Sequence, residues 1–148
     1  MSAVRDLAMV ESVLQRLCRS MLQYLAEAFP WTNAADKDTL DQIRKLIEEE
    51  KEAAVALGQW YVRRTRSAPY TGFFPNFFSN INFVSLDHCL PMLAEHERRL
   101  VDELEGDLRE LTDGESKAEV QKVLEMKKRH LKTVEALAVA HGTAAAVR

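Results

Sequence analysis

The chain has 148 residues, of which 47% are hydrophobic and 29% charged, and its formal net charge is -3. A chain of this length and composition is expected to form one globular domain, residues 1–148, around a single core. The small net charge, with acidic and basic residues mixed along the chain, argues against a nucleic-acid-binding protein, because such proteins carry a strong basic excess.

Neither the cysteines nor the apolar runs indicate secretion or a membrane. Cys18 and Cys89 lie far apart on predicted apolar helix faces, so we expect reduced core residues in a cytoplasmic protein. Charged residues near the N-terminus leave no apolar run for a signal peptide. The longest uncharged run, residues 67–86, contains prolines, asparagines and a glycine that a lipid-facing helix does not accommodate. We therefore expect no membrane segment.

The N-terminal half predicts a helical hairpin. Apolar residues recur at steps of three and four over residues 3–29, and Pro30 ends this helix because proline disfavours helix in the residue before it. A second helix is predicted over residues 35–64, with arginines at its end that complement the helix dipole. The short connection between them predicts antiparallel neighbours.

The next segment, residues 64–84, has no helical period and is rich in aromatic residues. Rings that bury apolar area would hold this segment against the helices. The alternative is that exposed rings form a dimer interface. The rings concerned are Tyr70, Phe73, Phe74, Phe77, Phe78 and Phe83.

The C-terminal half predicts a second hairpin. The third helix spans residues 85–111, with Pro91 in its first turns, and the fourth spans residues 115–141. Gly142 is predicted to end the fourth helix as a left-handed cap, which leaves a frayed tail.

The length of the 64–84 segment decides how the hairpins combine. Each helix is about 37 Å long, and the segment can reach about 70 Å when extended, so it can cross the whole bundle. We therefore predict an all-α fold, a four-helix bundle of two antiparallel hairpins joined by a long crossover. An up-down-up-down bundle stays open if the segment folds back on one end.

Four polar residues interrupt the apolar stripes: Glu50, Glu97, Lys127 and His130. Counting back from the predicted turns places Glu97 level with His130, and Glu50 near the middle of its hairpin. Parallel second and third helices would bring Glu50 to the same height, and Lys127 lies one turn from His130 on the same face. Buried charges must satisfy one another, bind something or face solvent.

In topology and in the placing of Glu50, Glu97 and His130, the chain resembles the ferritin-like four-helix-bundle superfamily. That resemblance implies a metal site here, because its di-iron members hold their ions with Glu and Glu-x-x-His ligands at mid-bundle. The chain departs from the pattern, since Ala53 stands where a histidine is expected and Lys127 where a glutamate is expected. The di-iron site is therefore expected to be degenerate or absent.

Three interpretations of the cluster stay open. Lys127 can replace a metal charge and pair with Glu50 and Glu97, while His130 is a hydrogen-bonded core residue. Alternatively, Glu50, Glu97 and His130 hold a single iron, manganese or zinc ion, with His96 as a further nitrogen ligand if the third helix is rotated. The third interpretation leaves all four side chains in water.

These features support two main hypotheses on function and assign no catalytic residue. The first is a ferritin-like bundle that acts as a non-catalytic binding or assembly module, as a homodimer. The second is a metal-binding or oxidase-type protein with an atypical site at Glu50, Glu97 and His130. A small-molecule pocket under the aromatic crossover, where Lys127 meets an anion, is a third.

Overall fold

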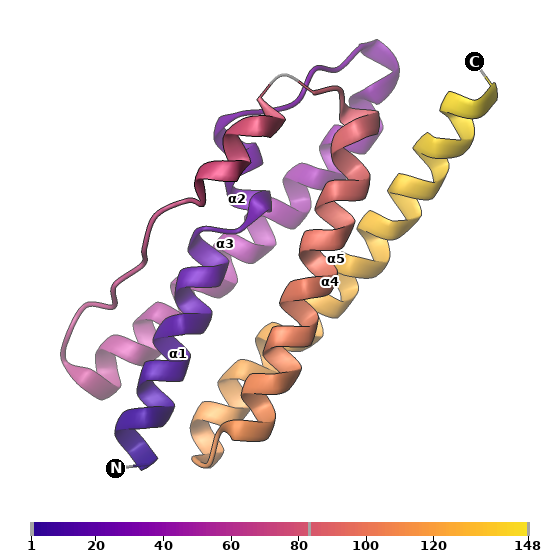
Figure 1. Ribbon diagram of the computed structural model, residues 1–148. Helices are drawn as coiled ribbons and strands as arrows, with labels where there is room; N and C mark the ends of the chain where they lie inside the picture. Colours follow the sequence, from indigo (N-terminus) through magenta and orange to yellow (C-terminus); the bar gives the residue numbers. More distant parts are fainter. Residues whose placement is uncertain (1, 83, 148) are drawn as a thin grey trace.

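The computed structural model describes residues 2–82 and 84–147, and this part of the chain is helical with no strand (Figure 1). The predicted all-α class is confirmed. The α-helices of the described residues are α1 (Ser2–Cys18), α2 (Met21–Glu27), α3 (Lys37–Thr65), α4 (Leu86–Glu110) and α5 (Gly114–Val147). Two short 3-10 helices, η1 (Ala34–Asp36) and η2 (Asn76–Ile81), lie in the connections.

The long helices run side by side, some of them parallel and others antiparallel (Figure 1). α1, α2 and α5 run upward in this view, and α3 and α4 run downward. α4 packs along α5, and α3 packs against α1 and α2. The segments leading into α3 and α4 are parallel neighbours, because Trp31 N donates to Val84 O and Leu86 N donates to Trp31 O, both at 3.0 Å. α3 and α4 therefore start at the same end of the molecule.

The prediction of one continuous helix over residues 3–29 is wrong, because the helix breaks at Arg19 and Ser20. Ser20 has extended backbone angles, φ -72° and ψ 163°, and its Oγ accepts a hydrogen bond from Gln23 N at 3.2 Å. Ser20 is thus the N-cap of α2. The apolar period continues across the break, which is why periodicity alone did not reveal it.

The predicted end of the last helix at Gly142 is also wrong. α5 continues through Gly142 to Val147. A glycine inside a helix costs only about 1 kcal/mol relative to alanine, and the three alanines that follow are strong helix formers.

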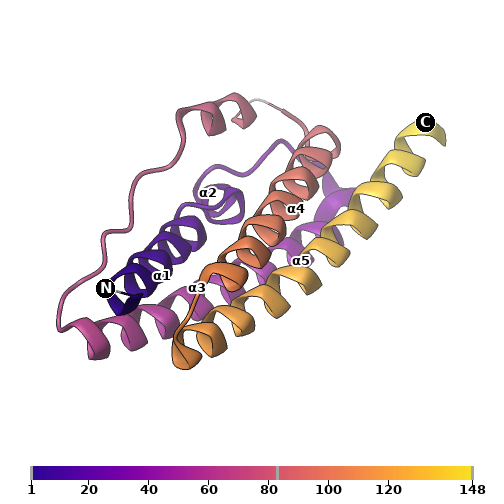
Figure 2. The ribbon, with the colours of Figure 1, turned by 60° about the horizontal axis from the view of Figure 1, so that its bottom comes forward.

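The connection between α3 and α4, which we call the crossover, spans residues 66–85 and passes along α1 and α2 (Figure 2). Arg66 ends α3 in the left-handed conformation with φ 59°. Arg19 holds the middle of the crossover, because its Nε donates to Gly72 O at 2.8 Å. Gly72 itself has φ +73°, which a side chain would disfavour.

The crossover rings differ in how far they are buried. Phe78 is buried and Phe74 half-buried, and both pack against Tyr24 of α2. Tyr70, Phe73 and Phe77 are exposed. The remaining ring, Phe83, lies outside the described residues.

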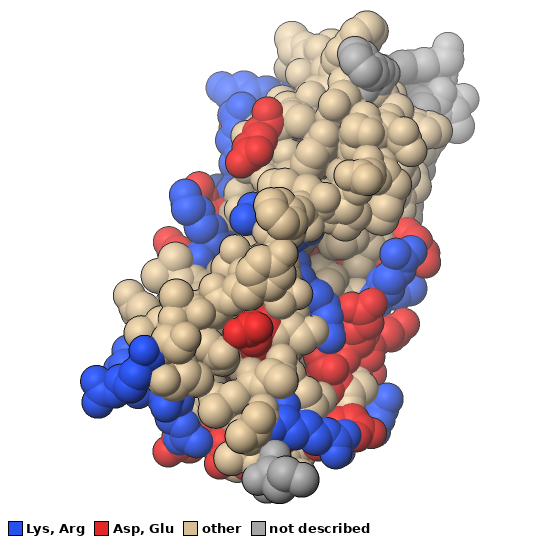
Figure 3. Space-filling view, turned by 60° about the vertical axis from the view of Figure 1, so that its left-hand side comes forward, with Lys and Arg blue, Asp and Glu red and all other residues tan. Residues whose placement is uncertain are grey.

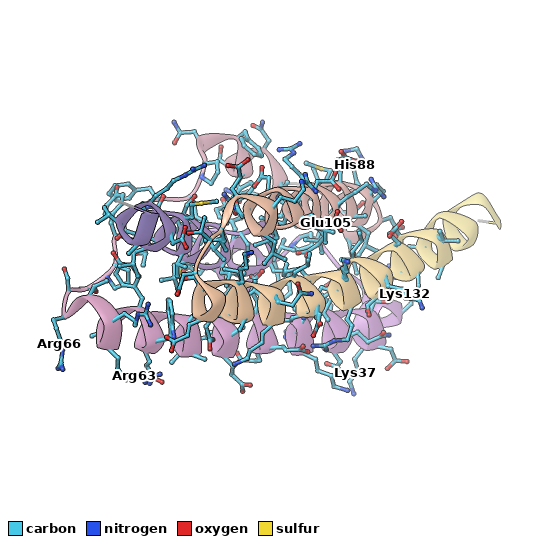
Figure 4. All side chains as sticks on the ribbon, turned by 90° about the horizontal axis from the view of Figure 1, so that it is seen from below. Lys37, Arg63, Arg66, His88, Glu105 and Lys132 are labelled. Atoms are coloured by element: carbon cyan, nitrogen blue, oxygen red, sulfur yellow. The ribbon has the colours of Figure 1, made fainter. Side chains whose placement is uncertain are left out.

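The interior contains two apolar clusters with a polar layer between them. One cluster surrounds Leu22 and Leu90 near the starts of α3 and α4, and the other surrounds Leu14 and Leu124 nearer the α4–α5 turn. In the view from below, side chains fill the space between the helices, whereas Lys37 and Arg63 point away from it (Figure 4). The helices thus place the predicted polar residues at mid-height.

A buried carboxylate fixes the start of α1 to the far hairpin. Asp6 is 1% exposed and accepts hydrogen bonds from Thr112 N at 3.1 Å and Asp113 N at 2.6 Å. These backbone hydrogen bonds hold the pKa of Asp6 below its ordinary value, and the bond from Asp113 has the largest effect.

Candidate functional site

The structure brings Glu50, Glu97, Lys127 and His130 together at the centre of the molecule. All four are buried, with exposed fractions of 1% or less. Lys127 Nζ lies 2.5 Å from Glu50 Oε2 and 2.9 Å from Glu97 Oε1. The second oxygen of Glu97, Oε2, is 2.7 Å from the same nitrogen as an ion-pair contact. An ammonium therefore lies between two carboxylates that come from α3 and α4.

Two residues that sequence reasoning missed complete the surroundings of Glu50. Its Oε1 accepts hydrogen bonds from Ser20 Oγ and from Gln23 Nε2, the latter at 3.1 Å. Ser20 thus caps α2 and binds the buried carboxylate at once. The Ser-x-x-Gln spacing, which is typical of a helix start, is the sequence signal that could have identified both residues.

His130 lies at the edge of the cluster as a neutral imidazole. Its Nδ1 is 3.4 Å from Lys127 Nζ, and its Nε2 is 3.6 Å from Glu49 Oε1 without a hydrogen bond among the described residues. Burial, reinforced by the ammonium of Lys127, lowers the pKa of His130 to about 4. The imidazole therefore accepts no proton at neutral pH.

The charges of the cluster depend on one carboxyl group. Burial raises the pKa of Glu97 to about 7, although the ammonium of Lys127 opposes this shift. Burial by itself would lower the pKa of Lys127, but Glu50 and Glu97 outweigh it and the net direction is upward. Lys127 is therefore charged, and Glu97 exchanges a proton near neutral pH.

The same geometry bears on the predicted metal site. An ion held by both Glu50 and Glu97 would have to take the place of Lys127 Nζ, since that nitrogen already contacts both carboxylates. His96 does not join the cluster, because its Nε2 accepts a hydrogen bond from Met21 N at 3.2 Å. Burial lowers the pKa of His96 to about 4. The metal site at Glu50, Glu97 and His130 stays a prediction.

A cavity of about 540 Å³ lies apart from this cluster, between the crossover, α1 and α4. Its apolar lining comes from crossover rings, among them Tyr70, Phe73 and Phe77. Figure 3 shows the side of the molecule on which the crossover lies, where charged side chains gather in the lower part and along the left edge. The third hypothesis from the sequence is a small-molecule pocket under the crossover in which Lys127 meets an anion. The cavity lies under the crossover, but Lys127 does not line it.

Three arginines and one glutamate supply the charges of this cavity. Arg16 is neutralised by Asp107 at 2.5 Å and Glu103 at 3.3 Å. Arg19 donates to Gly72 O and lies over the ring of Phe74 at 5.1 Å from its centroid. Arg99 is exposed and forms no ion pair with any described residue. The lining therefore has a cationic excess beside aromatic walls.

Comparisons with family models, with curated proteins and with solved structures gave no match for this chain. Among the described residues, none of the helices combines the length and the apolar character needed to cross a bilayer. Any statement on function therefore depends on the geometry of the molecule itself.

Proposed function

We propose that this protein is a ferritin-like four-helix bundle that acts as a non-catalytic binding module. In this account α1 and α2 together form the first helix of the bundle. Its ligand is a small organic anion with an aromatic or apolar part, and its binding site is the cavity under the crossover. The observation that carries the proposal is this cavity, in which exposed aromatic rings lie beside a cationic excess.

The centre of the bundle supports a non-catalytic role. In di-iron members of the ferritin-like superfamily, the mid-bundle carboxylates hold metal. Here the ammonium of Lys127 contacts both Glu50 and Glu97, so the carboxylates are already paired. The lysine thus occupies the position between the two carboxylates that a shared metal ion would need.

The cavity under the crossover has the chemistry of a ligand site. Pockets for small molecules have volumes of about 300–1,000 Å³ and combine apolar walls with a few polar groups that fix orientation. Phe73 is 85% exposed and Phe77 55% exposed, so these rings offer apolar area that the protein does not bury. The guanidinium of Arg99 is available for a carboxylate, sulfonate or phosphate group.

A titration with 8-anilinonaphthalene-1-sulfonate, an aromatic anion, tests the proposal by its fluorescence. We expect saturable binding to the folded protein and about fivefold weaker binding to Arg99→Gln, because a charge-assisted hydrogen bond is lost. Phe77→Ala should weaken binding by a similar factor through lost apolar contact. Arg109→Gln, which removes an exposed arginine from the same helix outside the cavity, serves as the matched control. Equal affinity in all four proteins would contradict the proposal.

Homodimerisation, which the sequence analysis predicted, stays a prediction. The exposed rings Tyr70, Phe73 and Phe77 all line the cavity, so ligand binding accounts for them without a second copy. Sedimentation equilibrium of the free and ligand-saturated protein would determine whether copies associate through this face.

A further inference from the structure

A second group of ligating side chains lies at the end of the molecule where α3 and α4 start. Asp36 ends η1, Asp87 lies in the first turn of α4, and His141 lies in α5. Their ligand-type atoms all lie within 4.8 Å of one another. The three residues come from elements that are far apart in sequence, so no local sequence motif predicts that they lie together.

The hydrogen bonds of His141 suggest what the group can bind. Its Nδ1 lies 2.5 Å from Asp87 Oδ1, and its Nε2 lies 2.8 Å from Thr39 Oγ1. When Nε2–H donates to Thr39, the lone pair of Nδ1 faces a carboxylate oxygen at close range. Two acceptor atoms 2.5 Å apart share a proton, because a metal ion bound to both at about 2.0–2.1 Å in tetrahedral geometry would hold them about 3.3 Å apart. An ion can replace this proton when the two side chains separate slightly, since both atoms are of the ligand type. A hydrogen bond from the other ring nitrogen is also the usual support of a metal-binding histidine.

The two carboxylates have no other strong cation. Among the described residues, no lysine or arginine forms an ion pair with Asp36 or Asp87, whereas His141 contacts Asp87. Asp36 is 7% exposed, and Asn33 N donates to its Oδ2 at 2.8 Å, which fixes the carboxylate and leaves Oδ1 for a ligand. Two carboxylates and a neutral imidazole carry a charge of -2, which a divalent cation would balance.

The surroundings leave room for the rest of a coordination sphere. A cavity of about 210 Å³ adjoins the group, and both Asp36 and Asp87 line it. It gives an ion access and space for a water ligand. Three protein ligands of mixed nitrogen and oxygen type, with a water as the fourth, are an arrangement that zinc accepts.

We propose that Asp36, Asp87 and His141 form a binding site for a divalent transition metal of the zinc type. The bound ion joins η1, the start of α4 and α5. In the bound state Nδ1 is the ligand and Nε2 donates its proton to Thr39, so the ion replaces the proton shared by Nδ1 and Oδ1, which moves to Nε2 or to the solvent. This site is separate from the cavity under the crossover and from the Lys127 cluster, so neither proposal depends on the other.

Calorimetric titration of the chelator-treated full chain with zinc chloride tests the site. We expect one ion per chain, and at least tenfold weaker binding to both Asp87→Asn and His141→Gln. Thr39→Val, which removes only the support of His141, should weaken binding by about tenfold. His88→Gln removes an exposed histidine that points outward from α4 next to Asp87, and it should bind as the unaltered protein does (Figure 4).

A second readout covers any variant that folds poorly. Zinc should raise the melting temperature of the unaltered protein and of His88→Gln, but not that of His141→Gln. His130→Gln distinguishes the central cluster, because loss of zinc binding in that variant alone would place the ion there. That outcome overturns the proposal, as does less than about a tenth of an equivalent of bound zinc, or unchanged binding in both Asp87→Asn and His141→Gln.

Discussion

Lys127 Nζ contacts two buried carboxylates, and the three groups together have a formal charge of -1 when all are ionised. The proton that Glu97 binds with a pKa of about 7 reduces this charge to zero. Burial of an uncompensated charge is costly, so the cluster is most stable when Glu97 is protonated. At the scale of single residues, the centre of this protein is thus sensitive to pH.

Glu97→Gln should remove this sensitivity. The folded-state pKa of about 7 lies above the ordinary glutamate pKa of 4.5, so the folded chain binds the extra proton. The stability that this proton contributes is complete below pH 4.5 and is lost as the pH rises through 7. The unfolding free energy of Glu97→Gln relative to the unaltered protein should therefore rise by roughly 3 kcal/mol between pH 4.5 and pH 8.

Urea denaturation at several pH values measures this difference. Glu95→Gln, which alters an exposed glutamate on the same helix, is the control and should follow the profile of the unaltered protein. Parallel profiles for Glu97→Gln and the unaltered protein would show that Glu97 does not exchange its proton in this range.

At the scale of elements, the break between α1 and α2 carries a contact that a continuous helix could not make. Ser20 and Ser85 are both N-caps, with φ and ψ of -72° and 163° in one and -73° and 162° in the other. Only Ser20 also donates to the buried Glu50. Comparison of Ser20 with Ser85 therefore separates the stability contributed by an N-cap from that contributed by the buried hydrogen bond.

Ser85→Ala should cost about 1 kcal/mol, the usual value of a lost cap. Ser20→Ala should cost about 1–3 kcal/mol more, because it also removes a hydrogen bond from a buried carboxylate. Chemical denaturation of both variants measures the difference. Equal losses would mean that Ser20 stabilises the protein only as a cap.

The positions of the helices could be predicted from sequence because their apolar stripes are long and regular, as in the stripe from Leu86 to Leu104. The break at Ser20 is not visible in periodicity, since the stripe continues from Leu17 to Met21 and no proline or glycine marks it. Only the Ser-x-x-Gln spacing signals it. The extension of α5 beyond Gly142 differs from the prediction because the alanines that follow favour helix more strongly than the glycine favours an end. Both errors concern the ends of helices, where local signals compete with one another.

At the scale of the whole molecule, the crossover binds to the bundle through a few rings. Phe78 is 1% exposed and packs against Tyr24, Phe74, Phe77 and His96. Phe73 belongs to the same segment but is 85% exposed. The two residues are of the same type and differ in burial, so a comparison of them isolates the effect of burial on stability.

Phe78→Ala should lower the unfolding free energy by about 3–5 kcal/mol, because it opens a cavity under the crossover. Phe73→Ala should change it by less than about 0.5 kcal/mol. Thermal and urea denaturation measure both. A small effect of Phe78→Ala would indicate that the crossover does not stabilise the bundle.

The two groups of polar residues differ in whether the sequence predicts that their members lie together. Glu50, Glu97, Lys127 and His130 could be placed together because each interrupts an apolar stripe and the turns fix their heights. The group of Asp36, Asp87 and His141 could not, because two of these residues lie at helix starts, where aspartate is common for local reasons. Only the packed helix ends bring them near His141.

The unfolding free energy of Lys127→Met shows whether Lys127 is paired with the two buried carboxylates, and Lys128→Met is the control. Lys127 is fully buried between two carboxylates, whereas Lys128 is 54% exposed and lies 3.5 Å from Glu105. We predict a loss of about 3–5 kcal/mol for Lys127→Met at pH 8 and less than about 0.5 kcal/mol for Lys128→Met. Equal stability of the two variants would show that Lys127 is not the cation that pairs with the buried carboxylates.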